Sequence, residues 1–282
     1  MNSSLLLSII TFVFGFAALL YLISWVFQKE VVGKAATWVT VVAVAGDAAG
    51  ILLRWNESYN IAGGYGHAPL SNIYESLVFF SLTIGLIYLV VERKYRNRII
   101  GCFAMPLSFF ALAYASFGTS AKIQPLIPAL KSNWLIAHVM TCFVGYSAFA
   151  LAFGVSIMYL IKAGKNETEG NSLLGRLPTS AILDEVTHQL IMFGFLFLTA
   201  GIITGAVWAN SAWGRYWGWD PKETWSLITW FVYATLLHAR LMRGWRGTPI
   251  AILSIVGFLA VIFTYFGVNL LPGLHSYGAM KG

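Results

Sequence analysis

Five long stretches without a charged side chain limit most strongly what this chain can fold into. Each is 19 to 29 residues long, and they span Leu5–Phe27, Ile99–Phe117, Asn133–Ile161, Val186–Val207 and Thr248–Leu271. A helix needs roughly 20 mostly apolar residues to cross the hydrocarbon core of a bilayer. Each stretch therefore predicts a transmembrane helix.

Three weaker stretches complete this pattern. Ala35–Leu53 contains Asp47, Ile73–Val91 contains Glu75, and Thr224–Ala239 has only 16 residues. Placing them in water would expose apolar segments of helix length. Only 10% of all residues are charged, whereas a soluble domain has about 25%. We therefore expect an all-α polytopic membrane protein with about eight transmembrane helices.

The basic residues predict how these helices are oriented. With the N-terminus outside, the inner loops carry twelve of the 18 Lys and Arg residues and the outer segments carry six. Membrane proteins keep an excess of Lys and Arg on the cytoplasmic side. We therefore expect both termini to be extracytoplasmic, in a single integral membrane domain over residues 1–282. The same rule explains the net charge of +7, so we expect no nucleic-acid partner.

The N-terminal residues and the two cysteines bear on processing and on the kinds of site that this chain can form. The first four residues carry no basic side chain, so we expect the first apolar stretch to be retained and not cleaved as a signal peptide. Cys102 and Cys142 both lie in apolar stretches, and the sequence has no CxxC or CxxCH. This excludes a disulfide scaffold, a cysteine zinc site and a covalently attached c-type heme on this chain.

Tryptophan is concentrated in one segment, residues 208–225, which the predicted topology places outside. Six of the eleven tryptophans fall between Trp208 and Trp230, and residues 213–225 read WGRYWGWDPKETW. Tryptophan favours the membrane interface, and such an aromatic belt explains Trp208 and Trp230. It explains the four tryptophans of 213–225 less well, because belt residues are scattered over many helix ends. Packed aromatic rings with interleaved glycines favour a flat platform for a large planar ligand.

The charged residues of this segment have two interpretations each. Asp220, Pro221 and Glu223 form the pattern of a helix N-cap, a first helical residue and a capping box. Arg215 and Lys222 are suited to pair with ligand carboxylates, and are equally compatible with solvation.

The tryptophan-rich segment resembles the WWD signature of the heme-handling protein family. The flanking sequences GAVWAN, ITWFVYATLLHAR and NLLPGLHSYG, and residues 69–76 (PLSNIYES), are similar to the CcsA/ResC branch, the membrane subunit of the System II cytochrome c synthase. The resemblance runs from about residue 67 to the end. It implies that Trp213, Trp217, Trp219, Asp220 and Trp225 form a heme platform, beside which Arg215 and Lys222 are the candidates for propionate contacts.

Two histidines are expected near the depth of this platform. His138 lies about six residues into its predicted helix, roughly 9 Å below the outer end, and His275 follows the last helix on the outside. Two neutral imidazoles facing each other across a ring supply both axial positions of a heme iron. The resemblance assigns this role to these two positions, His138 and His275.

The other three histidines are expected to differ from this pair. His238 lies fifteen residues after Glu223, roughly 22 Å deeper along a helix, and is too far away to share an iron with His138. The resemblance makes it a transmembrane heme ligand whose partner histidine comes from a CcsB/ResB-type subunit. An interfacial histidine beside basic residues is the alternative. We interpret His188 as interfacial and His67 as a surface residue.

The resemblance also implies a function, that of a holocytochrome c synthase (heme lyase) subunit acting with its CcsB/ResB-type partner. Heme b would pass from an inner site at His238 to the outer site, for thioether attachment to the CxxCH cysteines of apocytochrome c. No side chain resembles a catalytic nucleophile, acid or base for this step, so the chain would act by positioning. The bacterial cytoplasmic membrane or a thylakoid membrane is the expected location, with thiol-reducing proteins as further partners.

Three other functions stay open at this point. One is a heme transporter or chaperone without ligation, which would work without the partner. Another is a b-type electron-transfer subunit, but such proteins place histidine pairs at two depths, and only His238 lies at the deeper one. A general small-molecule permease is the last, and it leaves the tryptophan-rich segment unexplained.

Overall fold

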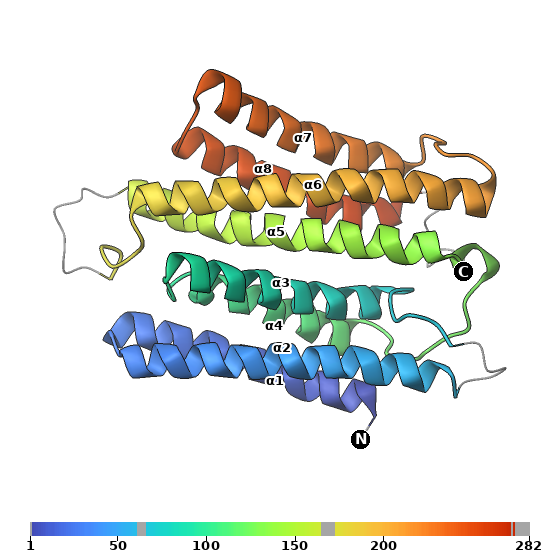
Figure 1. The fold of residues 1–282 in the computed structure, drawn as a ribbon, viewed down its shortest axis with the longest axis horizontal. Coiled ribbons are helices and arrows are strands. Elements are labelled where there is room, and N and C mark those ends of the chain that lie inside the picture. The colour runs from blue at the N-terminus through green and yellow to red at the C-terminus, as the bar shows by residue number, and fades with distance from the viewer. Residues whose placement is uncertain (1, 61–65, 165–172, 272, 274–282) are drawn as a thin grey trace. The chain divides into compact units, whose positions relative to one another are not determined.

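The computed structural model describes residues 2–60, 66–164, 173–271 and 273, and all regular structure in them is helical (Figure 1). Within these residues there are eight α-helices and two short 3₁₀ helices. In chain order they are α1 (Ser3–Phe27), α2 (Glu30–Ser58), α3 (Ile73–Tyr95), α4 (Gly101–Gly118), η1 (Pro128–Leu130), α5 (Asn133–Ala163), α6 (Ser180–Trp213), α7 (Pro221–Arg243), α8 (Thr248–Tyr265) and η2 (Gly267–Leu270).

These helices bear out the expected fold class of an all-α polytopic membrane protein. Among the described residues, seven helical segments are long and apolar enough to cross a membrane, and α7 is not one of them. Because α7 is 23 residues long, its composition and not its length sets it apart. The crossing by α7, and the extracytoplasmic location of both termini, stay predictions.

Several helices are longer than the charge-free stretches that predicted them. Helix α6 has 34 residues and begins at Ser180, before Asp184 and Glu185. At 1.5 Å per residue it is about 50 Å long, well beyond the roughly 30 Å hydrocarbon core. The tryptophan-rich segment is therefore helical at both ends, and only residues 214–220 connect α6 to α7.

The chain divides into two compact units. Unit 1 contains residues 1–127 and 164–182, and unit 2 contains residues 128–163 and 183–282. The single integral membrane domain over residues 1–282 stays a prediction.

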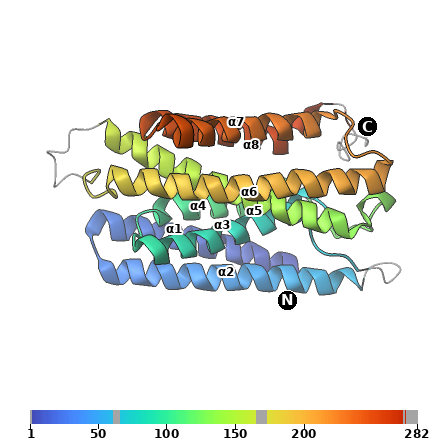
Figure 2. The same cartoon turned by 45° about the horizontal axis from the view of Figure 1, so that its top comes forward.

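Unit 1 is built from α1 to α4, in which α1 lies beside α2 and α4, and α3 lies beside α2 and α4 (Figures 1 and 2). Two of its buried carboxyl groups have a partner on a neighbouring helix. Arg54 Nε of α2 donates to Glu75 Oε1 of α3 at 2.9 Å, and both side chains are almost fully buried. Asp47 of α2 accepts a hydrogen bond from Ser81 of α3 at 2.5 Å. Asp47 and Glu75, which made their apolar stretches weaker candidates for membrane helices, thus each have a partner on a neighbouring helix.

A third buried carboxylate, that of Glu92 in α3, collects donors from several helices of unit 1. Tyr21 of α1 and Tyr88 of α3 donate to Oε2 at 2.8 and 2.7 Å. Thr37 of α2 donates to Oε1 at 2.6 Å, and Arg98 lies 3.2 Å from the same oxygen. A carboxylate buried in an apolar bundle is stable only when its oxygens are hydrogen-bonded in this way.

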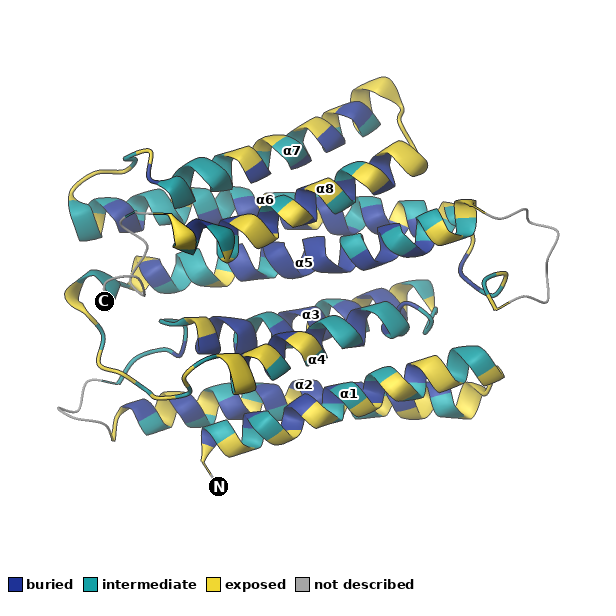
Figure 3. Cartoon of the chain, turned by 180° about the vertical axis from the view of Figure 1, so that it is seen from behind, coloured by how far each residue is buried: buried dark blue, intermediate teal, exposed yellow. Residues whose placement is uncertain are grey.

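Unit 2 is built around α5, in which every residue from Gly145 to Ala152 is buried (Figure 3). Helix α8 lies beside both α5 and α7. Phe149 of α5 stacks on Tyr233 of α7, with ring centroids 3.6 Å apart. At the far end from the tryptophan-rich segment, Asp184 of α6 forms an ion pair with Arg240 of α7 at 2.8 Å. These contacts hold the four helices around the site described next.

Candidate functional site

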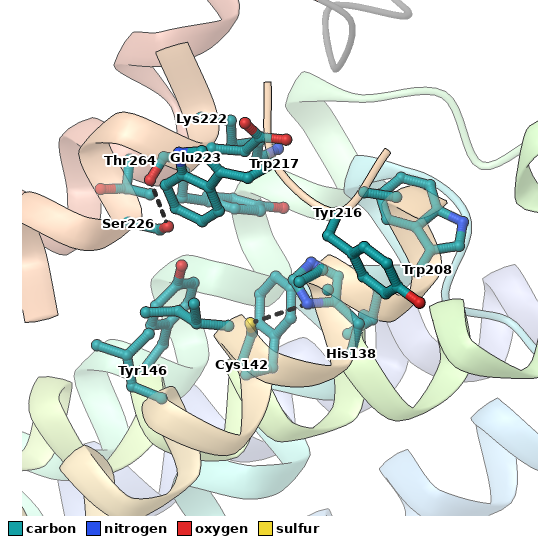
Figure 4. Close-up of a pocket in the computed structure, with 18 residues that line it drawn as sticks. His138, Cys142, Tyr146, Trp208, Tyr216, Trp217, Lys222, Glu223, Ser226 and Thr264 are labelled. Carbon is teal, nitrogen blue, oxygen red and sulfur yellow. Dashed lines mark hydrogen bonds between the residues drawn. The ribbon is translucent and has the colours of Figure 1, made fainter. Parts of the chain in front are cut away.

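Unit 2 contains a pocket at the end where residues 214–220 connect α6 to α7. The pocket is partly open to solvent, and its cavity has a volume of about 130 Å³. Its lining includes the aromatic residues Phe143, Tyr146, Trp208, Tyr216, Trp217 and Tyr265, and the polar residues His138, Cys142, Lys222, Glu223, Ser226 and Thr264 (Figure 4).

His138 enters this pocket from the second turn of α5. Its Nδ1 lies 2.7 Å from the carbonyl oxygen of Gly201 in α6. Its ring lies nearly parallel to that of Trp208, with an angle of 14° and ring centroids 5.9 Å apart. The imidazole is therefore held in place from α6 by both a hydrogen bond and an aromatic neighbour.

Trp208 differs from its sequence interpretation as an aromatic-belt residue. A belt residue faces lipid, but Trp208 is only 2% exposed and lines the pocket. Its indole Nε1 donates to the carbonyl oxygen of Ala129 at 2.9 Å. The belt interpretation is therefore wrong for Trp208. Trp230 is half-buried and donates to Thr199 of α6 at 2.9 Å, so it too contacts the bundle.

A capping box at the start of α7 fixes the connection from α6, as the pattern of Asp220, Pro221 and Glu223 predicts. Asp220 is the N-cap, and its carboxylate accepts from the Lys222 backbone N–H at 2.9 Å. Glu223 Oε2 accepts from the backbone N–H groups of Gly218 and Asp220, at 2.7 and 3.1 Å. The structural interpretation of these two acids is thus confirmed. Their hydrogen bonds set the conformation of residues 218–220, next to Trp217.

The remaining tryptophans of the segment do not all face the pocket. Trp217 lines it, and Trp219 lies edge-on to Trp217 but is 69% exposed. Trp213 packs edge-on against Trp208, with ring centroids 4.9 Å apart. Trp225 packs against Phe263 of α8. The structure therefore gathers Trp208 and Trp217 at the pocket, while Trp213, Trp219 and Trp225 do not line it.

The two basic residues of the segment also separate. Lys222 is half-buried and lines the pocket, and desolvation lowers the pKa of its ammonium group. Arg215 is not among the pocket residues, and its guanidinium lies close to the backbone of Gly218. Of the two expected contacts to a ligand carboxylate, only Lys222 is at the pocket.

The other histidines occupy separate places. His275 lies outside the described residues, but Gly273, two positions before it, packs against Asp220 at the start of α7. His238 is exposed on α7, fifteen residues beyond Glu223, and is not among the pocket residues. His188 is half-buried in α6, and His67 belongs to unit 1, where its Nε2 lies 3.2 Å from the Gln124 carbonyl oxygen.

Several pocket residues were not singled out from the sequence. Cys142 and Tyr146 follow His138 at intervals of four residues, so the three share one face of α5. This spacing is a signal that the sequence analysis missed. Thr264 and Tyr265 come from α8, and no pattern in the sequence connects them to the tryptophan-rich segment.

Comparison with known proteins identifies the family of this chain. The family described as "Cytochrome C assembly protein" matches residues 70–275. The chain belongs to this family. Two relatives are both cytochrome c biogenesis proteins CcsA. The one from Parasynechococcus marenigrum (strain WH8102) is 42% identical over 82% of each chain. The one from Porphyra purpurea is 37% identical over 96% of this chain and 97% of the relative. The chain is thus a multi-pass membrane protein of cytochrome c biogenesis, and resembles the CcsA proteins of cyanobacteria and plastids.

A solved structure shares the fold of this CcsA-like chain. It is the cytochrome c heme lyase CcmF, with a TM-score of 0.67 and 18% sequence identity. The match covers 96% of this chain and 50% of the CcmF chain. At this identity the likeness establishes the fold alone.

Proposed function

We propose that the pocket of unit 2 holds heme on the outer side of the membrane and presents it to apocytochrome c. The observation that carries this proposal is His138, whose imidazole projects into a pocket walled by Trp208 and Trp217 and is held through Nδ1. Imidazole nitrogen is a usual axial ligand of heme iron, and aromatic walls suit a flat porphyrin. The ammonium group of Lys222 at the pocket suits a propionate. The residues present therefore fit heme.

His275 is proposed as the second axial ligand of this external site. The packing of Gly273 against Asp220 supports this, because it brings the chain just before His275 to the start of α7. Trp213, Trp219, Trp225 and Asp220 then act as a supporting frame around the pocket, and Arg215 is the weaker candidate for a propionate contact.

The reaction proposed for this site is thioether formation. The S–H of each CxxCH cysteine adds across a heme vinyl group, so that the sulfur bonds to one vinyl carbon and the hydrogen is taken up by the other. The chain's own contribution is to hold heme in a fixed orientation, which lowers the entropic part of the barrier. A CcsB/ResB-type subunit is the proposed partner, and it would complete an inner heme site at His238. The exposure of His238 on α7 is compatible with a ligand supplied by another chain.

Substitution of the histidines tests this function. We expect His138→Ala and His275→Ala to abolish cytochrome c assembly, and added imidazole to restore part of it by filling the vacant coordination position. His67→Ala is the control and should assemble cytochrome c normally. Loss of assembly in His67→Ala together with normal assembly in His138→Ala would overturn the proposal.

Heme content separates the two proposed sites. With the partner subunit co-expressed, His138→Ala should retain heme at the inner site, whereas His238→Ala should purify with little heme. Trp217→Ala should behave like His138→Ala in this assay. It removes a wall of the outer site and leaves the proposed inner ligand His238 in place. Heme is measured as pyridine hemochrome on equal amounts of protein. Equal heme in His238→Ala and wild type would exclude the inner site. Cytochrome c assembly without any partner subunit would exclude the proposed partner dependence.

A further inference from the structure

The hydrogen bond between His138 and Gly201 determines which ring nitrogen of His138 carries a proton. Nδ1 lies 2.7 Å from the carbonyl oxygen of Gly201. A carbonyl oxygen only accepts hydrogen bonds, so Nδ1 must be the donor. In a neutral imidazole with a proton on Nδ1, the lone pair that bonds a metal is on Nε2.

Cys142 is the competing partner of the same nitrogen. Its Sγ lies 3.6 Å from His138 Nδ1 (Figure 4). A thiol is a weak donor, and it can donate to Nδ1 only if that nitrogen has no proton. The shorter contact to Gly201 requires the proton. The carbonyl of Gly201, and not the thiol of Cys142, therefore sets the tautomer.

Two glycines of α6 make this contact sterically feasible. A Cβ atom at position 205 would lie 2.6 Å from His138 Nδ1 and 2.7 Å from Cε1. A Cβ atom at position 201 would lie 2.6 Å from Cys142 Sγ and 3.2 Å from the Cys142 backbone nitrogen. Side chains at these two positions would displace the imidazole or push α5 away from α6.

Close helix packing alone does not account for both glycines. Gly194 also brings α6 close to α5, since its Cβ position lies 2.6 Å from a ring atom of Phe149. The three atoms nearest to that position belong to Phe149 and Gly145, so Gly194 serves as the example of helix packing. At Gly201 and Gly205 the close approach coincides with a hydrogen bond to a pocket side chain, and that bond is an observation independent of the glycine spacing.

We propose that Gly201 and Gly205 are positioning residues that fix His138 as the Nδ1–H tautomer with Nε2 as its metal-binding nitrogen. Gly201 supplies the backbone acceptor, and Gly205 leaves the space that the ring occupies. The consequence for heme rests on the proposed function. A histidine ligand whose other nitrogen donates to a carbonyl is oriented and donates more strongly to its metal.

The tautomer is measured first in the heme-free, full-length protein. Nitrogen-15 NMR of histidine-labelled protein distinguishes a protonated from an unprotonated ring nitrogen, and His138→Gln identifies the His138 signals by their loss. We expect a protonated Nδ1 and an unprotonated Nε2 in wild type and in the packing control Gly194→Ala. Gly205→Ala should lose this pattern. A protonated Nε2 in wild type, or an unchanged pattern in Gly205→Ala, would overturn the proposal.

Variants of the Cys142 contact provide a second, independent measurement. Cys142→Ala should keep the wild-type tautomer, because the acceptor is a backbone carbonyl. Gly201→Ala should disturb it, and the double variant Gly201→Ala with Cys142→Ala should recover it in part, because the Sγ atom that the new methyl group would meet is gone. A changed tautomer in Cys142→Ala would assign the role to the thiol instead.

Heme-loaded protein then tests the consequence for the metal. We expect Gly205→Ala to raise the heme reduction potential, since weaker donation by His138 favours ferrous iron, and Gly194→Ala to leave it unchanged. The two proposals fail differently. If the tautomer is as expected but His138→Ala leaves the heme spectrum unchanged, the proposed function fails and the positioning role stands. If His138→Ala loses the outer heme while Gly205→Ala changes neither tautomer nor potential, only the positioning role fails.

Discussion

In unit 1 several buried polar side chains connect neighbouring helices, whereas in unit 2 several polar side chains among the helices line a pocket. Arg54 with Glu75, and Glu92 with its four donors, use their polar atoms to connect helices. His138 and Lys222 of unit 2 instead line a pocket that is partly open to solvent. Buried polar groups that are satisfied internally indicate a structural role, and those at a pocket indicate binding.

The first two helices lie outside the family match but contact residues within it. The match begins at residue 70, after α1 and α2. Nevertheless, Arg54 of α2 pairs with Glu75, and Tyr21 of α1 and Thr37 of α2 donate to Glu92. The first two helices therefore supply partners to acidic residues that lie within the matched region, and we infer that they stabilise unit 1 without contributing to the pocket.

Breaking the Arg54–Glu75 pair should have the largest effect on stability. Removing one partner of a buried ion pair leaves an uncompensated charge and costs about 3–5 kcal/mol. We expect Arg54→Ala to lower the free energy of unfolding by about 3–5 kcal/mol. The loss is measured as a decrease in the unfolding temperature of the detergent-solubilised protein. The double variant Arg54→Leu with Glu75→Leu should lose less, because it leaves no buried charge. If Arg54→Ala were as stable as wild type, the buried ion pair of unit 1 would not have the structural role that distinguishes it from the pocket residues of unit 2.

Removing one helix N-cap in each unit should lower stability by less, and should distinguish the unit that has the pocket from the unit that does not. Asp220 caps α7 in unit 2, and Asn72 caps α3 in unit 1 by accepting from the Glu75 backbone N–H. Loss of an N-cap costs about 0.5–2 kcal/mol. We expect Asp220→Ala and Asn72→Ala to lose similar stability, measured by thermal unfolding. Only Asp220→Ala should also weaken heme retention, because it releases the connection beside Trp217. Equal heme loss in both variants would remove the distinction.

His67→Ala should have the smallest effect. Both ring nitrogens lie near carbonyl oxygens, 3.1 Å from Ala68 and 3.2 Å from Gln124. A neutral imidazole has one N–H and donates only one of these two hydrogen bonds. Such a bond contributes about 0.5–1.5 kcal/mol, and less where water replaces it. We expect a small decrease in unfolding temperature and an unchanged heme spectrum. A changed heme spectrum would place a heme contact in unit 1.

The pattern of the sequence predicted much of the fold but less of the site. Apolar stretches located the helices, and the capping box at Asp220 and Glu223 was predicted from four consecutive residues. From the sequence, His138 was assigned to the site but Trp208 to an aromatic belt, whereas the two rings lie together in the pocket. The spacing of Cys142 and Tyr146 from His138 was visible in the sequence, although their place in the pocket depends on α8.

What the sequence by itself determined is the set of helices, because in a membrane each backbone must satisfy its own hydrogen bonds within one continuous apolar segment. That requirement is local, so it can be predicted from neighbouring residues. Only the tertiary structure decided which side chains meet: Arg54 with Glu75, His138 with Gly201, and Trp217 but not Trp219 at the pocket. Those contacts join residues on different helices or depend on how a loop is held. They follow from close packing, in which a glycine or one extra methyl group decides how near two helices come.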